Sequence, residues 1–177
     1  MKMFELQRWA EEHWNSFAEM QSDPEVMADL GGPFTRDASR EKFDRYRDAW
    51  KTDGVSRWAV VDYAGAFLGY AGIMIRRDPD HPLGVHHEIG WRFRRDAWGK
   101  GLATQSARQA LHHAWSVLDV PEIVSYTARD NLRSRNVMRR LGLRRDPHRD
   151  FTARYPRGDW TGLVWVAERP AAITSSR

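Results

Sequence analysis

Gly99 and Gly101 lie where a run of residues typical of a strand gives way to one typical of a helix. The start of a helix has up to four backbone N–H groups without partners and carries the positive end of the helix dipole. Because glycine has no Cβ, a phosphate group can approach such amides closely. Arg94, Arg95 and Lys100 would add positive charge at the same place. The spacing predicts a turn that binds a pyrophosphate, and a tight strand-to-helix turn without further function is the alternative.

The chain has no cysteine among its 177 residues. Disulfides, thiolate-bound zinc, iron–sulfur clusters and a cysteine nucleophile are therefore excluded for this chain. The adjacent pairs His86 and His87, and His112 and His113, do not indicate a metal site, because neighbours in a strand or helix point apart. We expect no bound metal ion.

Most of the basic residues are arginines, whereas the excess of basic over acidic residues is small. Lysine and arginine together number 28 against 24 aspartates and glutamates, a formal net charge of +4, and the lysines among them are Lys2, Lys42, Lys51 and Lys100. The arginine guanidinium group suits phosphate and carboxylate partners. The arginine-rich stretch 129–149 is open to four interpretations: it binds a phosphate of a ligand, an acidic protein or RNA, or it forms a solvated helix face.

Hydrophobic periodicity predicts a mixed α and β structure. Strands are predicted at residues 4–9, 56–63, 66–75, 85–93, 121–128, 143–145 and 162–168. Helices are predicted at residues 10–20, 24–30 with Asp23 as the cap, 35–51, 98–118 and 131–141, and a polar connection at 146–159. This order predicts an α+β fold in which helices flank a mostly antiparallel sheet of six or seven strands.

The length is typical of one domain, which we expect to cover residues 1–177 with a flexible tail from about residue 170. No apolar run approaches the ~18 residues that cross a bilayer. Residues 1–12 carry charges where a signal peptide has its apolar core. A cytoplasmic protein is therefore expected.

Three motifs occur in register along the chain. They are Glu88-Ile89-Gly90-Trp91, then Trp98-Gly99-Lys100-Gly101-Leu102-Ala103-Thr104, and then the stretch from Asn131-Leu132-Arg133-Ser134 to Leu143. In order, spacing and placement they resemble the E-I-G-[YW], W-G-x-G-x-A-T and N-x-x-S-x-x-[VL]-x-x-x-L-G-[FL] elements of the GNAT superfamily of acetyl-CoA-dependent N-acetyltransferases. The resemblance is closer to the branch that includes ribosomal-protein N-terminal acetyltransferases, and the order of predicted elements agrees over about residues 4–168.

The resemblance implies where acetyl-CoA would bind. Backbone groups of Trp91, Arg92 and Phe93 would pair with the pantetheine arm, and the strands at 85–93 and 121–128 would splay apart to admit it. Asn131 would hold the same arm, and its alternative role as the cap of the helix at 131–141 is compatible with this one. The pyrophosphate would lie on the glycine turn, whose implied contacts are Arg94, Trp98, Gly99, Lys100, Gly101, Leu102 and Ala103, with Thr104 close behind.

One residue departs from the superfamily pattern. Gln or Arg often stands three residues before the first glycine of the second motif, and here Asp96 holds that position. A carboxylate would repel a pyrophosphate unless it points away or caps the helix. Arg94 or Arg95 would then supply the missing positive charge.

Two side chains are candidates for proton transfer. Free amines have pKa values of about 8 to 10.4, so a base must remove a proton before the amine attacks the thioester. Glu88 is the candidate base, acting directly or through water, with an ion pair to arginine as the alternative. Ser134 would lie near the sulfur and donate to the leaving CoA thiolate, with a bond to its own helix backbone as the alternative.

The sequence thus predicts an acyltransferase that moves an acetyl group from acetyl-CoA to a primary amine by direct attack in a ternary complex. The acceptor would be a protein N-terminus or a small-molecule amine. The alternatives are an arginine-rich nucleic-acid-binding domain and an acyl-CoA sensor, each on the same fold without turnover. We expect neither a membrane nor a nucleic-acid partner, and a homodimer is left open.

Overall fold

The sheet has eight strands, one more than the upper number predicted. The computed structural model describes residues 4–155 and 158–171. In this part of the chain the strand order is β1-β2-β3-β4-β5-β8-β6, and β7 pairs with the first half of β8. The strands are β1 (Glu5–Gln7), β2 (Arg57–Val61), β3 (Phe67–Arg76), β4 (His86–Phe93), β5 (Glu122–Thr127), β6 (Arg144–Arg145), β7 (Phe151–Tyr155) and β8 (Gly158–Glu168).

The strands β4 and β5 run parallel, whereas the other neighbouring strands in the described residues run antiparallel. The parallel ladder consists of one residue pair, Glu88 with Val124. By contrast, β3 and β4 pair from Gly69 with Phe93 to Arg76 with His86. The strands β4 and β5 therefore meet near their starts and separate toward their ends, as the splaying implied by the resemblance requires.

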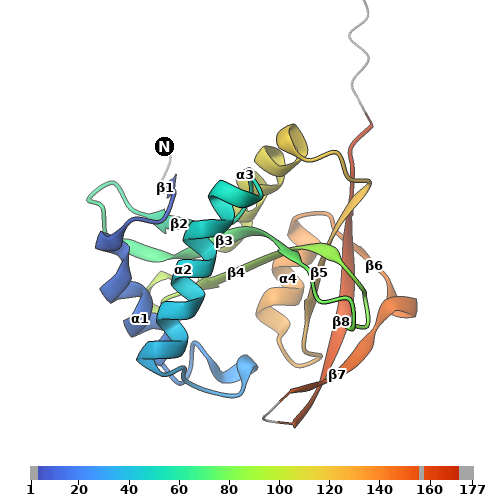
Figure 1. Cartoon of the computed structure of the whole chain (residues 1–177), viewed down its shortest axis with the longest axis horizontal. Coiled ribbons are helices and arrows are strands. Elements are labelled where there is room, and N and C mark those ends of the chain that lie inside the picture. The colour runs from blue at the N-terminus through green and yellow to red at the C-terminus, as the bar shows by residue number, and fades with distance from the viewer. Residues whose placement is uncertain (1–3, 156–157, 172–177) are drawn as a thin grey trace, which may run out of the picture.

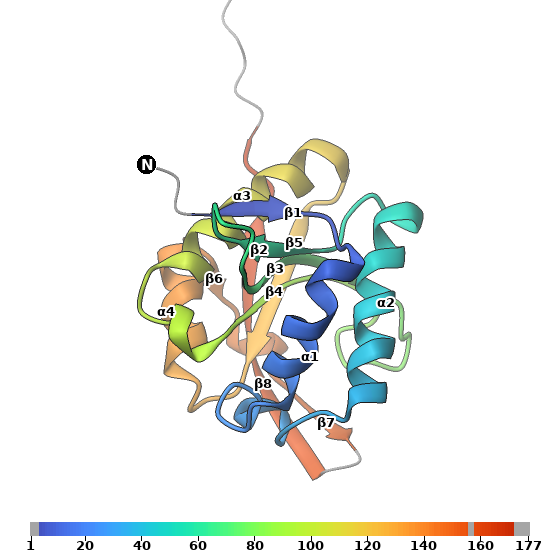
Figure 2. The same cartoon turned by 90° about the vertical axis from the view of Figure 1, so that its left-hand side faces the viewer.

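Helices cover both faces of the sheet (Figures 1 and 2). The helices α1 (Trp14–Ser22) and α2 (Arg36–Thr52) lie on one face, where Phe17, Phe43 and Tyr70 belong to a buried cluster. The helices α3 (Leu102–Val117) and α4 (Leu132–Arg140) lie on the other. The crossover that a parallel strand pair needs is α3, which connects β4 to β5.

The two faces of β4 differ in chemistry, as its alternating residues predict. Ile89, Trp91 and Phe93 pack with the cluster beneath α3. Because side chains alternate along a strand, Glu88 and the other even-numbered residues of β4 face α1 and α2. The polar side chains of this strand other than His87 thus lie on the face opposite α3.

The helix predicted at residues 24–30 does not form. Asp23 accepts hydrogen bonds from the N–H groups of Glu25 and Val26 at 2.9 and 3.3 Å, as a cap would, but turns and a short 3₁₀ helix follow. A helix of so few residues gains too few backbone hydrogen bonds to offset nucleation. Gly31, at φ +80°, ends the segment.

The polar connection predicted at 146–159 contains strand β7, and β8 begins at Gly158 rather than at residue 162. This hairpin is polar because much of it is exposed, and the hydroxyls of Thr152 and Thr161 bond across it at 2.9 Å. Phe151 is its buried anchor, opposite Gly162. A hydrophobicity pattern alone does not predict a hairpin at the edge of a sheet when one of its faces is exposed to solvent.

The helix predicted from residue 98 begins at Leu102, because residues 98–101 form the glycine turn. Most of the tail predicted from about residue 170 lies outside the described residues. No described helix combines the length and the apolar character needed to cross a membrane.

Candidate active site

The glycine turn presents a set of backbone donors. Gly99 and Gly101 have φ angles of +77° and +75°, and no side chain caps α3. Among the described residues, no acceptor is bonded to the N–H groups of residues 99–104. The buried hydroxyl of Thr104 likewise has no partner there. A Cβ at Gly99 would meet nothing within 4 Å, so the space above the turn is open. The residues present therefore fit a pyrophosphate.

The charge around this turn is not arranged as predicted. Arg94 binds Asp96 at 3.1 Å, and Arg95 binds Asp23 at 2.7 Å, so neither guanidinium is free of a carboxylate. This pairing explains how a carboxylate at position 96 is compatible with the turn: the Asp96 side chain binds Arg94 and does not cap α3.

Positive charge at the turn comes from Lys100, one of the three basic residues predicted there, and from Arg133 of the arginine-rich stretch. Lys100 is exposed within it and has no ion-pair partner among the described residues. The Arg133 guanidinium lies 3.8 Å from the centroid of the Trp98 ring. Of the arginine-rich stretch, Arg133 is therefore brought to the proposed phosphate site.

The gap between β4 and β5 exposes peptide groups. The Arg94 N–H donates to Leu68 O at 3.0 Å, toward the β3 side. Alternate residues of a strand direct their peptide groups to opposite edges, so those of Trp91 and Phe93 point toward β5. Phe93 O accepts from the Trp98 indole at 2.9 Å, which leaves the Phe93 N–H and both groups of Trp91 facing the gap.

Arg92 does not fit its implied backbone role. Its peptide group faces β3, because it has the same parity as Arg94. Its side chain donates to Asp29 at 2.7 and 3.0 Å and to Val26 O. Arg92 thus fastens the α1–α2 connection to the sheet beside the gap.

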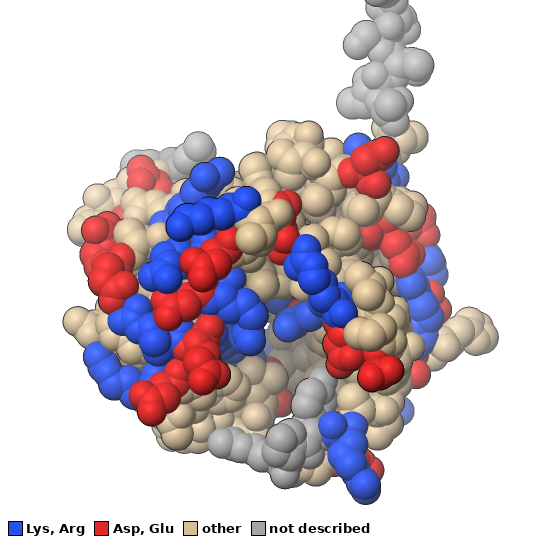
Figure 3. All heavy atoms as spheres, viewed as in Figure 1, with Lys and Arg blue, Asp and Glu red and all other residues tan. Residues whose placement is uncertain are grey.

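A cavity of about 1410 Å³ extends from this gap across the sheet face below α2. Its walls come from α2, β3, β4, β5, the start of α4 and the β7–β8 hairpin. Figure 3 shows the molecular surface hollowed at this place, with basic side chains near the opening. The volume suits a ligand arm together with a second substrate.

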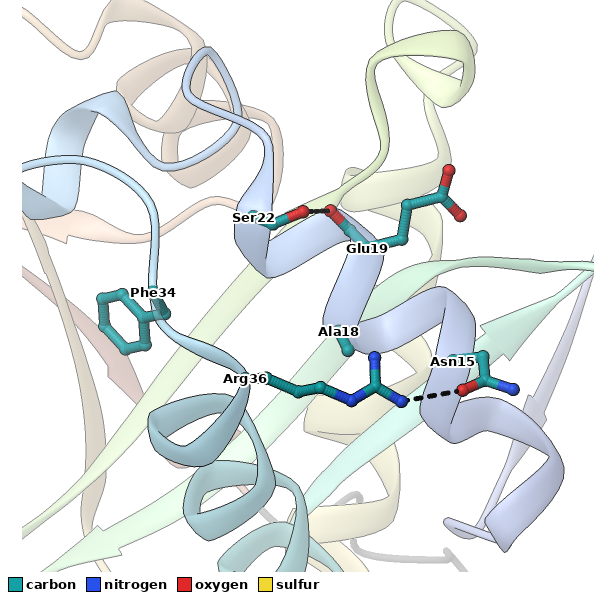
Figure 4. Close-up of a pocket in the computed structure, with 6 residues that line it drawn as sticks. All are labelled: Asn15, Ala18, Glu19, Ser22, Phe34 and Arg36. Carbon is teal, nitrogen blue, oxygen red and sulfur yellow. Dashed lines mark hydrogen bonds between the residues drawn. The ribbon is translucent and has the colours of Figure 1, made fainter.

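A smaller cavity of about 170 Å³ lies between α1 and the start of α2 (Figure 4). Arg36 donates to Asn15 at 3.2 Å there, and the Ser22 hydroxyl donates to Glu19 O at 2.7 Å. Arg36, Asn15 and Ser22 thus have partners within the chain, and none of the lining residues is a buried titratable group. The larger cavity is the better candidate for chemistry.

Glu88 lines the large cavity but is held by two guanidinium groups. Its Oε1 lies 3.0 Å from Arg57, its Oε2 binds Arg76, and the carboxylate is buried. Burial by itself would raise the pKa of Glu88, but the charges of Arg76 and then Arg57 lower it to about 2. The ion pair left open by the sequence is therefore present, and such a carboxylate is a weak base.

Gly90 explains how the ion pair fits on the sheet. A Cβ at this position would lie 2.7 Å from the Arg57 guanidinium nitrogen and 3.1 Å from Glu88 Oε1. Arg57 also donates to Glu88 O at 3.1 Å and to Gly72 O. The glycine of the first motif thus makes room for a buried arginine.

Asn131 and Ser134 stand at the start of α4. The Asn131 Oδ1 accepts from the Ser134 N–H at 3.1 Å and caps the helix, while its Nδ2 donates to Asp29 at 3.4 Å. Ser134 lines the cavity, and no described residue accepts a hydrogen bond from its hydroxyl. The alternative in which this serine bonds to its own helix is therefore not observed.

A tyrosine of the cavity wall and a histidine at the start of β4 form a second polar pair. The Tyr126 hydroxyl lies 3.3 Å from His86 Nε2, and His86 Nδ1 lies 2.6 Å from Gly84 O. The carbonyl requires a proton on Nδ1, so Nε2 is the acceptor. Burial lowers the pKa of His86, which is therefore neutral at pH 7.

Sequence reasoning missed the residues that the fold brings to the cavity from outside the three motifs. Arg57, Arg76 and Tyr126 are separated along the chain and follow no spacing rule. A weak signal existed for Arg57, because a charged residue begins an otherwise apolar strand. The interpretation of His86 as an isolated surface or core histidine overlooked its partner, since the contact is 40 residues away.

The comparisons with known proteins agree with this geometry. Residues 4–144 match the family model of the acetyltransferase (GNAT) domain. The chain is 30% identical over 146 residues to the FsC-acetyl coenzyme A-N(2)-transacetylase of Aspergillus fumigatus, which covers 78% of this chain and 61% of that protein. This chain therefore spans less than two thirds of the length of that relative.

Solved structures share the fold. An acetyltransferase of the GNAT family from Bacillus anthracis superposes with a TM-score of 0.77 at 20% identity, over 95% of this chain and 96% of that one. Spermidine N-acetyltransferase from Vibrio cholerae, solved with CoA and spermine, gives 0.73 at 13% identity over 94% and 96%.

An open strand gap that ends at a glycine turn, whose backbone donors have no partner among the described residues, fits an acyl-CoA-dependent transferase. The chain belongs to the GNAT acetyltransferase family. The acyltransferase class and acetyl-CoA as co-substrate, both predicted from the sequence, are confirmed by this membership. The closer resemblance to ribosomal-protein N-terminal acetyltransferases is not confirmed. Among the described residues, no group of three or more His, Asp or Glu side chains could hold a metal ion.

Proposed function

We propose that this protein transfers the acetyl group of acetyl-CoA to the primary amine of a small molecule, by direct attack in a ternary complex. The observation that carries the proposal is the gap between β4 and β5, which opens at one end to the glycine turn and at the other to the large cavity. Spermidine N-acetyltransferase, which shares the fold and acts on a small amine, supports a small acceptor over a protein N-terminus.

The chain's own groups would hold acetyl-CoA in two places. The N–H groups of residues 99–104, the Thr104 hydroxyl, Lys100 and Arg133 would bind its phosphates. The peptide groups of Trp91 and Phe93 would bind the pantetheine arm in the gap, with Asn131 beside it. When bound, acetyl-CoA supplies a thioester carbonyl that an amine can attack.

The N–H groups that face the gap would also stabilise the negative charge that develops on the carbonyl oxygen. The Ser134 hydroxyl, which has no protein acceptor among the described residues, would donate to the departing thiolate. A hydroxyl already bonded within the helix would be less available for this donation. The arrangement thus gives both developing charges a donor from the chain.

We further propose that Tyr126 and His86 accept the proton of the amine. Tyr126 lines the cavity just beyond Ser125, whose hydroxyl donates to Ile89 O at 2.9 Å where the two strands separate. The hydroxyl can take a proton from the amine as it passes its own to His86 Nε2. Glu88 as the base stays a prediction, which its two arginine partners oppose.

The two candidate bases are separable by kinetics. We expect Tyr126→Phe to lower kcat about 100-fold at pH 7, because it removes the relay without moving His86. Glu88→Gln should lower kcat by less than Tyr126→Phe once protein stability is controlled. Steady-state rates measured from pH 6 to 9 test both variants. The opposite ranking would return the base role to Glu88.

The function itself is tested by thiol release from acetyl-CoA with a panel of small amines and N-terminal peptides. Acetylation of small amines supports the proposal, and acetylation of peptides alone favours the N-terminal acetyltransferase. Calorimetry that shows CoA binding without turnover of any amine would favour an acyl-CoA sensor. Binding of RNA or DNA that weakens steeply with salt, without CoA binding, would favour the nucleic-acid alternative. A cytoplasmic location and a homodimer stay predictions.

A further inference from the structure

Lys42 is a buried ammonium group on the wall of the large cavity. It lies on α2, is 7% exposed and lines the cavity. Among the described residues its Nζ makes one hydrogen bond, to the Gln21 Oε1 at 3.5 Å, and the Gln21 Nε2 has no partner there. No carboxylate of the described residues lies within 4.0 Å of this ammonium. A buried charge without an opposite charge is costly, so its presence calls for an explanation.

The acidic residues of the cavity do not neutralise Lys42. Glu88 is buried and already has two guanidinium partners, so these three groups together carry a surplus positive charge. Asp78 and Asp130 are unpaired but exposed at the mouth. The remaining acids of the lining are ion-paired: Asp29 with Arg92, Asp48 with Arg47, Asp53 with Arg77, and Asp159 with Arg154.

Aromatic side chains surround the ammonium. Its Nζ lies 5.0, 5.9 and 5.7 Å from the ring centroids of Phe34, Tyr46 and Tyr70. Burial would raise the pKa of Tyr70, but Lys42, and then Arg92 and Arg57, lower it to about 7. The cations thus create a positive potential that favours an anion at this end of the cavity. Near pH 7 the anion opposite Lys42 is either the Tyr70 phenolate or a bound ligand, whereas burial raises the pKa of Tyr46 and keeps its hydroxyl a donor.

We propose that the acceptor carries a carboxylate in addition to its amine, and that Lys42 binds this carboxylate with help from Tyr46 and Tyr70. This inference rests on the proposed function, because it places the anion at the acceptor end of the same cavity. A carboxylate supplies a negative charge to Lys42 in place of the Tyr70 phenolate, so Tyr70 keeps its proton and both phenol hydroxyls can donate to the carboxylate. Polyamines, which carry only positive charge, are disfavoured by the same potential.

The kinetic test compares matched amines. Each amino acid, such as leucine or tyrosine, is assayed beside its amide and its decarboxylated amine, and phosphoethanolamine beside ethanolamine distinguishes a phosphate from a carboxylate. We expect kcat/KM to be at least about tenfold higher for the amino acid than for its amide, with Lys42→Met abolishing the difference. The matched control is Lys51→Met, which removes an exposed lysine of the same helix and should leave the preference intact.

A binding test does not depend on turnover. The chain has four lysines, so protein labelled with ¹³C at lysine Cε gives a small set of signals, and Lys42→Met identifies that of Lys42. Acetate added to the CoA-loaded protein should shift the Lys42 signal with saturation, whereas acetamide should not, and the Lys51 signal should respond to neither.

The outcomes separate the two proposals. If no amine is acetylated, the proposed function fails, and the response of the Lys42 signal to acetate alone decides whether the anion site exists. If amino acids and their amides are acetylated equally well, or if acetate leaves the Lys42 signal unmoved, the carboxylate site is overturned while the acetyltransferase stands.

Discussion

At the residue scale, the site is built from backbone donors more than from side chains. Gly99 and Gly101 hold left-handed conformations that give the turn its shape, and the N–H groups of residues 99–104 face no protein acceptor among the described residues. A peptide group cannot be removed by mutation, but the approach to it can be blocked. This makes the turn testable through its glycines.

We predict that Gly99→Val weakens CoA binding by at least about 100-fold. The new side chain would enter the open space above the turn and keep a phosphate from the amides. A valine at φ +77° also costs about 1 to 3 kcal/mol of backbone strain. Calorimetric titration with CoA measures the affinity.

The control for strain is Gly65→Val. Gly65 lies in the β2–β3 turn at φ +83°, also with nothing within 4 Å of a built Cβ. The Gly65→Val protein should be destabilised about as much as the Gly99→Val protein, but its affinity for CoA should be unchanged. Equal loss of affinity in both variants would mean that strain, and not a blocked phosphate site, explains the result.

At the scale of elements, α4 is positioned by the same residue that is proposed to touch the cofactor. Asn131 caps the helix through Oδ1, and its Nδ2 reaches Asp29, which also binds Arg92. The cap fixes the start of α4, and with it Ser134, against the gap between β4 and β5. One side chain thus serves two functions that a pair of variants can separate.

We predict that Asn131→Asp keeps the cap and lowers CoA affinity, because the carboxylate can accept from the Ser134 N–H but loses the amide donor and adds a negative charge beside Asp29. Asn131→Ala should lose about 1 kcal/mol of stability as well as affinity. Urea unfolding and CoA titration measure the two effects.

Thr35→Ala is the control for Asn131→Ala, because it removes a helix cap at another place in the molecule. Thr35 caps α2 by accepting from the Ala38 N–H at 3.2 Å, away from the proposed CoA turn. It should reduce stability by a similar amount without weakening CoA binding. Unchanged CoA affinity in Asn131→Asp would restrict Asn131 to its structural role.

At the scale of the whole molecule, the ion pairs of Glu88 connect three strands. Arg57 belongs to β2, Arg76 to β3 and Glu88 to β4, so the carboxylate joins the middle of the sheet. Its pKa of about 2 in the folded protein lies below the ordinary value of 4.5. The charged form is therefore favoured by folding.

We predict that this pair makes stability depend on pH in acid. A carboxyl group with a depressed pKa stabilises the fold above its ordinary pKa, and that contribution is lost as the pH falls from about 4.5 to about 2. The shift corresponds to about 3 kcal/mol. Glu88→Gln should lower the free energy of unfolding by a similar amount at pH 7, because it leaves two guanidinium groups without an anionic partner. The variant should also show a weaker dependence of stability on pH in acid.

Urea unfolding at several pH values between 2 and 7 measures the free energy of unfolding for both proteins. Glu168→Gln is the control, since Glu168 forms an exposed pair with Arg144 and should change stability by less than about 1 kcal/mol. An identical acid dependence in Glu88→Gln and the unmodified protein would contradict the buried pair as its source.

The sequence by itself determined the order of the main elements, the glycine turn and the family. These features depend on local rules: periodicity sets strands and helices, a glycine pair permits a left-handed turn, and Asn131 and Thr35 cap helices through bonds that span three residues. The sequence did not predict strand β7, because an edge hairpin with a solvent-exposed face lacks a strong apolar pattern.

The tertiary structure decided which residues line the cavity together and which charge state each of them has. Lys42, Tyr70, Arg57 and Tyr126 come from α2, β3, β2 and β5, and no spacing rule joins them. The same packing turned Glu88 from a candidate base into a paired anion, since burial and two nearby guanidinium groups set its pKa. Charge state depends on distance and solvent exposure, and both arise only when distant segments pack together.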